Sequence, residues 1–225
     1  MTFAAGSFHG LRYVAESAWG VTPSTPSMID LRHTSCNLGL SKETFTSGEL
    51  RADRMISDMR HGNKKVAGDV GVDFSWKEYD ALLESTLMGA WNANVLKAGV
   101  TPKSFTVERK FGDITQYGKF TGCMVDKFSL SIKPNAIVTG TFSFVGSDGT
   151  FSGTPLDATP DASQTESPYD SFTGTISEGG SPIAILTGLD FSLENGINPA
   201  MVVGSSYAAA LVPVRFERPG TRAAA

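Results

Sequence analysis

Polar and apolar residues alternate with a period of two in several stretches of this chain. The alternation is clearest in residues 36–47, 66–74, 124–132 and 136–144. Successive side chains of a β-strand point to opposite faces, so each stretch would place its apolar residues on one face and its polar residues on the other. This division is typical of an antiparallel sheet that packs on a core with one side and meets water with the other.

The polar positions of these stretches define a candidate face. Apart from Lys127, its members are small or acidic. A basic surface holds nucleic acid by releasing counterions from the phosphates, whereas an acidic surface of small side chains would let such a chain slide past. The predicted face consists of Asn37, Ser41, Glu43, Asp69, Asp73, Ser129, Ser131, Thr139, Thr141 and Ser143.

A helical period stands out in residues 76–89. Ser75 and Glu78 fit a capping box at its start, and Gly89 fits its end. The helix is expected to lie across an open side of a β-sandwich through its apolar residues, which are Trp76, Tyr79, Leu82, Leu83 and Leu87.

Residues 49–65 form a dense run of charges of both signs. On a lone loop, ordering such side chains would cost more than exposed ion pairs return, about 0–1 kcal/mol each. We therefore predict a long loop or hairpin extension that reaches an adjacent molecule, with a solvated tip as the alternative. Its charged and apolar contact residues would be Glu49, Arg51, Asp53, Arg54, Met55, Ile56, Asp58, Met59, Arg60, Lys64 and Lys65.

Length and composition agree with one large domain, or with one domain plus an appendage, that has a real core. The chain has 225 residues, 40% of them hydrophobic and 19% charged. Residues 146–182 contain no Lys or Arg and are rich in Gly, Ser, Thr, Pro and Asp. Loops longer than about 12–15 residues are usually functional or disordered, so this segment is expected to be an acidic, exposed excursion.

Little in the sequence indicates catalysis. The net charge of −4 argues against a conventional nucleic-acid reader. The two cysteines, Cys36 and Cys123, are expected to be buried free thiols, and the three histidines lack the close partners of a metal site. No nucleophile elbow or phosphate-binding glycine loop is present, and no apolar run approaches the length of a membrane span. The sequence therefore predicts neither an enzyme nor a cofactor, and no membrane contact.

Two consecutive regions together resemble the tail tube (major tail) proteins of long-tailed bacteriophages. The first is "ESAWGVTPSTPSMIDLRHTSCNLGLSKETFTSGELRADR", and the second is "HGNKKVAGDVGVDFSWKEYDALLESTL". The match includes the Trp-Gly-x-Thr-Pro start, the Glu-Leu-Arg-x-Asp-Arg turn, the Gly-Asp-Val strand and the Tyr-Asp-x-Leu-Leu-Glu helix. It covers residues 14–90 well and the rest of the chain more loosely.

The resemblance implies a mainly β (α+β) fold, with two packed antiparallel sheets and one flanking helix. Such subunits form hexameric rings that stack into a tube, and their sheets close into a shared inner β-barrel through which genomic DNA travels. The polar face would line that lumen, and the charged extension would bridge subunits. The implied partners are further copies of the chain, the tape measure, tail terminator and distal tail proteins, and DNA in transient passage.

On this basis residues 1–145 are expected to form the tube core, with residues 146–182 as the excursion. Residues 183–225 would form a C-terminal hairpin that completes or decorates the core. The resemblance places the protein in the virion tail after assembly in the host cytoplasm. A β-rich baseplate, fibre or adhesin module remains an alternative, because it would share this composition.

Overall fold

The structure, a computed structural model, describes residues 8–49, 53, 58–172, 177–182, 186–213 and 222–223. All pairs between its named strands are antiparallel. Within these ranges there is one α-helix, α1, which spans Asp80–Leu87. The prediction of a mainly β protein with antiparallel sheets and one helix is therefore confirmed.

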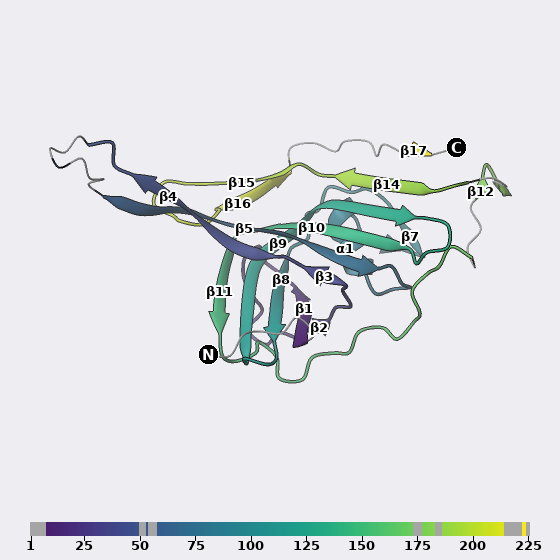
Figure 1. Ribbon diagram of the computed structural model, residues 1–225, viewed down its shortest axis with the longest axis horizontal. Coiled ribbons are helices and arrows are strands. Elements are labelled where there is room, and N and C mark those ends of the chain that lie inside the picture. The colour runs from purple at the N-terminus through teal and green to yellow at the C-terminus, as the bar shows by residue number, and fades with distance from the viewer. Residues whose placement is uncertain are drawn as a thin grey trace.

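A single long strand, β9 (Gln116–Ile132), organises the fold. Its first half pairs with strands of one sheet, and its second half pairs with strands of another. The two sheets are thus continuous through β9 (Figure 1). Among the described strands no barrel closes within the single chain.

The first sheet has the strand order β2-β1-β8-β9, with β11 on the other side of β9. The bounds of its other strands are β1 (His9–Ala15), β2 (Ile29–Asp30), β8 (Phe105–Phe111) and β11 (Asp148–Ser152).

The second sheet has the order β14-β9-β10-β5, and β3 and β4 both pair with β5. The short strand β17 pairs with β14 at two positions. The bounds are β3 (Ser35–Cys36), β4 (Gly39–Thr46), β5 (Met59–Asp73), β10 (Thr139–Gly146), β14 (Leu189–Glu194) and β17 (Arg222–Ala223).

Three two-stranded hairpins complete the described elements. The β15–β16 hairpin lies beside the base of the β4–β5 hairpin (Figure 1), where the amide of Lys64 donates to the carbonyl of Ser206 at 2.6 Å. The strands of these hairpins are β6 (Trp91–Asn92), β7 (Val95–Leu96), β12 (Ser177–Glu178), β13 (Ser181–Pro182), β15 (Ile197–Ala200) and β16 (Ala210–Pro213).

Gly122 marks the point at which β9 passes from the first sheet to the second. Its φ of +65° lies in the left-handed region that glycine enters without steric cost. Pairing with β8 ends at the next residue, Cys123, and pairing with β10 begins at Met124. A Cβ at position 122 would also meet the ring of Trp19 at 3.0 Å. The bend that joins the two sheets therefore depends on this glycine.

The core lies between the two sheets and is rich in aromatic rings. The first sheet contributes Tyr13 and Phe105, whose rings meet edge to face at 5.6 Å between centroids. The second contributes Phe128 and Phe142, whose rings stack at 4.7 Å. Tyr79 closes one side of the core, and burial raises the pKa of its hydroxyl to about 12. These ring contacts add to the free energy gained by burying apolar surface, which dominates folding.

The helix is shorter than the sequence predicts, and the predicted capping box is wrong. Lys77 has a φ of +60°, which prevents helical geometry in the first predicted turn. The N-cap is Tyr79, and no side chain caps this end. The helix packs against β9. Trp76 is 55% exposed, so the prediction that it lies across the sheet is also wrong.

The Glu78 carboxylate instead helps to hold the segment that follows β11, residues 153–172, here called the strap. Glu78 is buried and accepts from the amides of Arg32 at 2.9 Å and Gln164 at 2.7 Å. The wholly buried Glu108 accepts from the amide of Leu156 at 2.7 Å. Figure 1 shows the strap passing β2 on its way toward β12.

The sequence expectation for residues 146–182 needs correction where the structure describes them. Residues 148–152 form β11, an ordinary strand of the first sheet. The strap has many exposed side chains, as expected, but its backbone is hydrogen-bonded to the core along its length. The carboxylates that hold it are distant in sequence, which explains why local composition could not show the attachment.

Candidate functional site

The second sheet has a polar face built by strict alternation along its strands. Thr139 of β10 lies between Ser131 of β9 and Asp73 of β5, and the next polar positions repeat this arrangement. The register in this way brings together seven predicted residues, namely Asp69, Asp73, Ser129, Ser131, Thr139, Thr141 and Ser143.

The other three predicted residues lie toward the β3 and β4 side. Asn37 joins the face, because its side-chain oxygen accepts from the amide of Asp69 and its amide donates to the Asp69 carbonyl at 3.0 Å. Ser41 pairs with Lys65 in the register of β4 and β5. Glu43 lies farther along β4, at a register irregularity, and is exposed.

The sequence prediction missed the part of this face that β14 provides. Asp190, Ser192 and Glu194 alternate with buried or half-buried apolar residues and lie opposite Ser131, Ser129 and Lys127 of β9. The signal was present, since "LDFSLE" has the same period of two as the other strands. Together with β9 and β10, β14 lines a shallow hollow on the face.

The carboxylates of the face are tied to neighbouring strands. The Ser143 hydroxyl donates to Asp69 at 2.6 Å, and the Ser131 hydroxyl donates to Asp190 at 2.6 Å. The Lys127 ammonium lies 3.8 Å from Glu194 and is the one cation facing them in β9 and β10. These bonds hold acidic side chains along the sheet. The result is a smooth face of small hydroxyls and carboxylates.

The opposite side of the same strands is apolar and packs against the core. Val70, Val72 and Phe142 are at most 1% exposed. Gly68 interrupts this pattern where the backbone of Leu38 crosses β5, because a Cβ there would lie 2.4 Å from the Leu38 Cα. The polar side of the sheet is therefore free to meet another molecule while its reverse side anchors it to the core.

The β4–β5 hairpin projects from the body of the molecule and is here called the arm (Figure 1). Its two strands pair as far as Thr46 and Met59, and the amide of Ser47 donates to the carbonyl of Asp58 at 2.9 Å. The expected extension at 49–65 is therefore a hairpin whose residues 59–65 belong to β5. Four predicted contact residues lie outside the described residues: Arg51, Arg54, Met55 and Ile56.

The described outer part of the arm exposes apolar as well as charged side chains. Phe45 is 57% exposed and Met59 is 64% exposed. Arg60 pairs with Asp58 at 2.7 Å, and Glu49, Asp53 and Lys65 are exposed. The arm therefore offers apolar as well as charged side chains on a projecting surface.

Lys64, another predicted contact residue, pairs with a residue of the first sheet. Its ammonium lies 2.8 Å from the Asp148 carboxylate at the start of β11, and its side chain is 22% exposed. It therefore anchors the arm to the first sheet.

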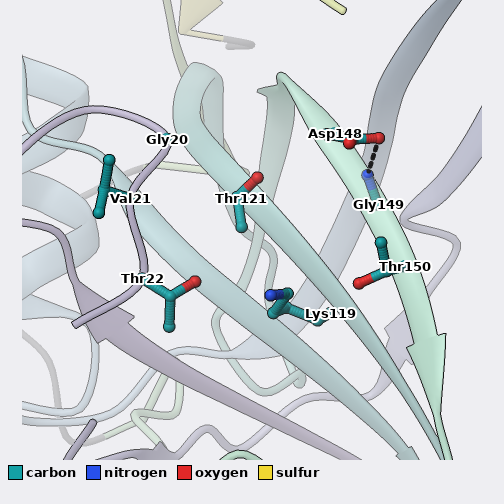
Figure 2. A pocket seen from close by; sticks show the side chains of 8 residues that line it. All are labelled: Gly20, Val21, Thr22, Lys119, Thr121, Asp148, Gly149 and Thr150. Carbon is teal, nitrogen blue, oxygen red and sulfur yellow. Dashed lines mark hydrogen bonds between the residues drawn. The ribbon is translucent and has the colours of Figure 1, made fainter. Parts of the chain in front are cut away.

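A second hollow, between the loop at residues 20–22 and strands β9 and β11, offers no catalytic arrangement. Figure 2 shows threonine hydroxyls and the Lys119 ammonium around it, with Asp148 accepting from the amide of Gly149 at 2.8 Å. Its eight lining residues include neither a histidine nor a cysteine that could act as a base or a nucleophile. In the described parts of the chain, no group of His, Cys, Asp and Glu has the arrangement of a metal site.

Both cysteines are free thiols, and burial raises the pKa of Cys123, which makes it an unreactive core residue. Cys36 is partly buried. Within the described ranges, no helix is long and apolar enough to cross a membrane.

Comparison with known proteins decides the family. The family model described as "Phage tail tube protein" matches residues 6–221. The chain belongs to the phage tail tube protein family. This membership supports a structural role in a tail tube and a place in the virion tail. It also favours a non-enzymatic protein. No curated protein sequence matches the chain.

Solved structures similar to this tail tube protein include three assemblies of tubular particles. The tail of an empty GTA particle, refined with C6 symmetry, has a TM-score of 0.44 and 11% identity over 67% of this chain and 98% of that one. The tube-terminating cap of the anti-feeding prophage has a TM-score of 0.40 and 8% identity, covering 68% and 92%. The sheath–tube complex of an extracellular contractile injection system, PVC, has a TM-score of 0.39 and 6% identity, covering 64% and 88%.

Proposed function

We propose that this chain forms hexameric rings that stack into a tail tube, the conduit for genomic DNA, with the polar face of the second sheet lining the lumen. The observation that carries the proposal is the polar face itself, which runs unbroken from β14 across β9 and β10 to β5. Its acidic, hydroxyl-rich surface provides few cations to hold phosphates, so a DNA chain would pass without sticking.

The open edges of the second sheet support ring formation. On the β14 side, β17 covers only Leu189 and Asp190, and in the described part of the chain no strand covers the remainder. On the other side, β3 and β4 present their outer edges. Unpaired edges invite pairing with another chain, and closure of a ring removes them. Six copies joined in this way would form a shared inner β-barrel.

The arm supplies the contact between subunits in this proposal, across the seam from one ring to the next. The described residues that would meet the neighbour are Glu49, Asp53, Asp58, Met59, Arg60 and Lys65. Charge pairs at such a seam set register and orientation more than affinity, while the apolar side chains supply burial. The tape measure, tail terminator and distal tail proteins would contact the tube, which would assemble in the host cytoplasm.

Electron microscopy of the purified full-length chain tests the assembly. At high protein concentration we expect six-fold rings and tubes of uniform width in negative stain. Discrete particles at every concentration would contradict the proposal and would favour a baseplate, fibre or adhesin module instead. In a high-resolution map of the tubes we expect Asp73 and Thr139 at the inner wall, and any other location would contradict the lumen assignment.

Reversing charge on the polar face should slow DNA passage without preventing assembly. In the variant Asp69→Lys and Asp73→Lys, two added ammonium groups would hold phosphates, so DNA ejection from virions carrying the variant should be slower and more dependent on salt. The matched control is Asp161→Lys with Glu166→Lys, two exposed strap residues, which makes the same change in charge away from the polar face and the arm. Ejection at the wild-type rate from the first variant would refute the electrostatic part of the proposal.

A further inference from the structure

We propose that His9 and His33 form an acid-sensitive latch that holds the base of the arm against the first sheet. The pair lies outside the polar face and has no part in the function proposed above. His9 is in β1, and His33 lies in the connection between β2 and β3. Their rings meet edge to face, with 4.9 Å between centroids.

A continuous hydrogen-bonded chain fixes the protons of both rings. The Nε of Arg109 lies 3.0 Å from His9 Nε2, and an arginine can only donate. His9 Nε2 therefore accepts, so its proton is on Nδ1, which lies 2.8 Å from His33 Nε2. His33 Nε2 accepts in turn, and its own Nδ1 donates to the carbonyl of Leu31 at 3.1 Å. The first two links together require both imidazoles to be neutral.

The far end of Arg109 holds the base of the arm. Its two terminal nitrogens donate to the carbonyls of Leu38 and Cys36, the latter at 3.1 Å. These residues directly precede β4, the first strand of the arm, and Leu38 is wholly buried. One guanidinium in β8 thus connects the histidine pair to the point at which the arm leaves the core.

Protonation would oppose the two links that end on an imidazole nitrogen. An added proton on His9 Nε2 would face the Arg109 donor, and one on His33 Nε2 would face the His9 donor. The titratable groups around the His9 ring are Arg109 from β8, His33 from the β2–β3 connection and the Cys36 thiol beyond Arg109, while Phe111 contacts the ring at 5.4 Å. None of these groups is a carboxylate that could stabilise an imidazolium.

The expected pH dependence follows from this environment. Burial, with Arg109 and His33, lowers the pKa of His9 to about 4 from its ordinary 6.5. Between pH 6.5 and 4 the open state therefore binds a proton on His9 that the closed state does not bind. The latch is thus fully closed above about pH 6.5 and weakens as the pH falls toward 4. Between pH 7.5 and 5 the opening equilibrium should rise about tenfold, after discounting for the half-exposed ring.

Two measurements on the full-length chain test the latch, with rings and monomers separated by size. Long-range ¹H–¹⁵N spectra report the tautomers, and we expect Nδ1–H on both histidines at pH 7. Hydrogen exchange, corrected for intrinsic rates, should show about tenfold lower protection of residues 36–42 at pH 5 than at pH 7.5. Wild-type protein with His9 as the Nε2–H tautomer, or with equal protection at both pH values, would overturn the proposal.

The double variant His9→Gln and His33→Gln isolates the cause. A glutamine amide can accept from Arg109 and donate onward but does not titrate in this range. The double variant should therefore protect residues 36–42 equally at pH 5 and pH 7.5. His61→Gln is the matched control, because His61 is exposed on the arm and should leave the wild-type dependence unchanged. A full pH response in the double variant would contradict the latch. If the double variant does not fold, the wild-type spectra and exchange still decide.

Discussion

Replacing Arg12 with Met should lower the free energy of unfolding by about 3–5 kcal/mol, the cost of leaving a buried charge without its partner. Glu108 is wholly buried under the strap. A terminal nitrogen of Arg12 lies 3.4 Å from one of its oxygens, and the amide of Leu156 donates to the other at 2.7 Å. Arg12 also pairs with Asp30 at 2.8 Å. Urea unfolding followed by tryptophan fluorescence would measure the change.

The pH dependence of this variant has a definite sign. Burial raises the pKa of Glu108, and the Leu156 amide and Arg12 oppose that rise. Without Arg12 the pKa rises further. A protein with a carboxyl whose folded-state pKa is raised loses stability as the pH increases through that pKa. The free energy of unfolding of Arg12→Met should therefore lie farther below that of the wild type at pH 8 than at pH 5.

Two further variants show whether the unpaired charge is the cause. Arg60→Met removes an arginine whose side chain is 82% exposed, and this matched control should change stability by less than about 0.5 kcal/mol. Adding Glu108→Gln to Arg12→Met keeps an acceptor for Leu156 and removes the charge, so it should recover more than half of the loss. Equal losses in the single and double variants would show that packing, and not charge, is responsible.

Shortening the arm should abolish tube formation while the fold stays intact. The structure suggests a clean junction, because Lys42 and Lys64 are cross-strand partners at the arm's base. Joining them through Asn-Gly in place of residues 43–63 makes a two-residue hairpin turn and keeps the Lys64–Asp148 ion pair. The removed strands are largely exposed, so little core packing is lost. Negative-stain imaging and the far-ultraviolet spectrum would measure assembly and fold.

A graded variant controls for the length of the deletion. Joining Phe45 to Arg60, also cross-strand partners, through Asn-Gly removes only the tip and Met59. If the tip makes the contact, both variants should remain single subunits or single rings. If the exposed Phe45 is the main contact, only the longer deletion should remain as single subunits or single rings, and the shorter deletion should still form tubes. Normal tubes from the longer deletion would refute the role of the arm.

The polar face could be predicted from the sequence because it depends on one local rule. Strand residues two apart share a face, so residues such as Thr139, Thr141 and Ser143 could be grouped before any pairing was known. The β14 positions followed the same rule and were overlooked. The arm was also visible as charge between two alternating segments, although its strand pairing extends farther than expected.

The errors arose where tertiary contacts overrode local preference. Ser75 and Glu78 have the spacing of a capping box, but Glu78 instead binds the amide of Gln164, which lies 86 residues away. The composition of the strap indicated exposure, but not that two buried carboxylates would hold its backbone. The partners of His9 are equally remote in sequence, at 24 and 100 residues. No local pattern encodes such distances.

The passage of β9 through both sheets has a mechanical consequence. A pull on the half of β9 that belongs to the second sheet is carried along an unbroken covalent backbone past Gly122 to the first sheet, with no intervening loop to absorb it. Detaching one layer from the other would require breaking the ladders on both halves of this strand. The sheet that carries the polar face and the sheet behind it therefore resist strain as a single unit.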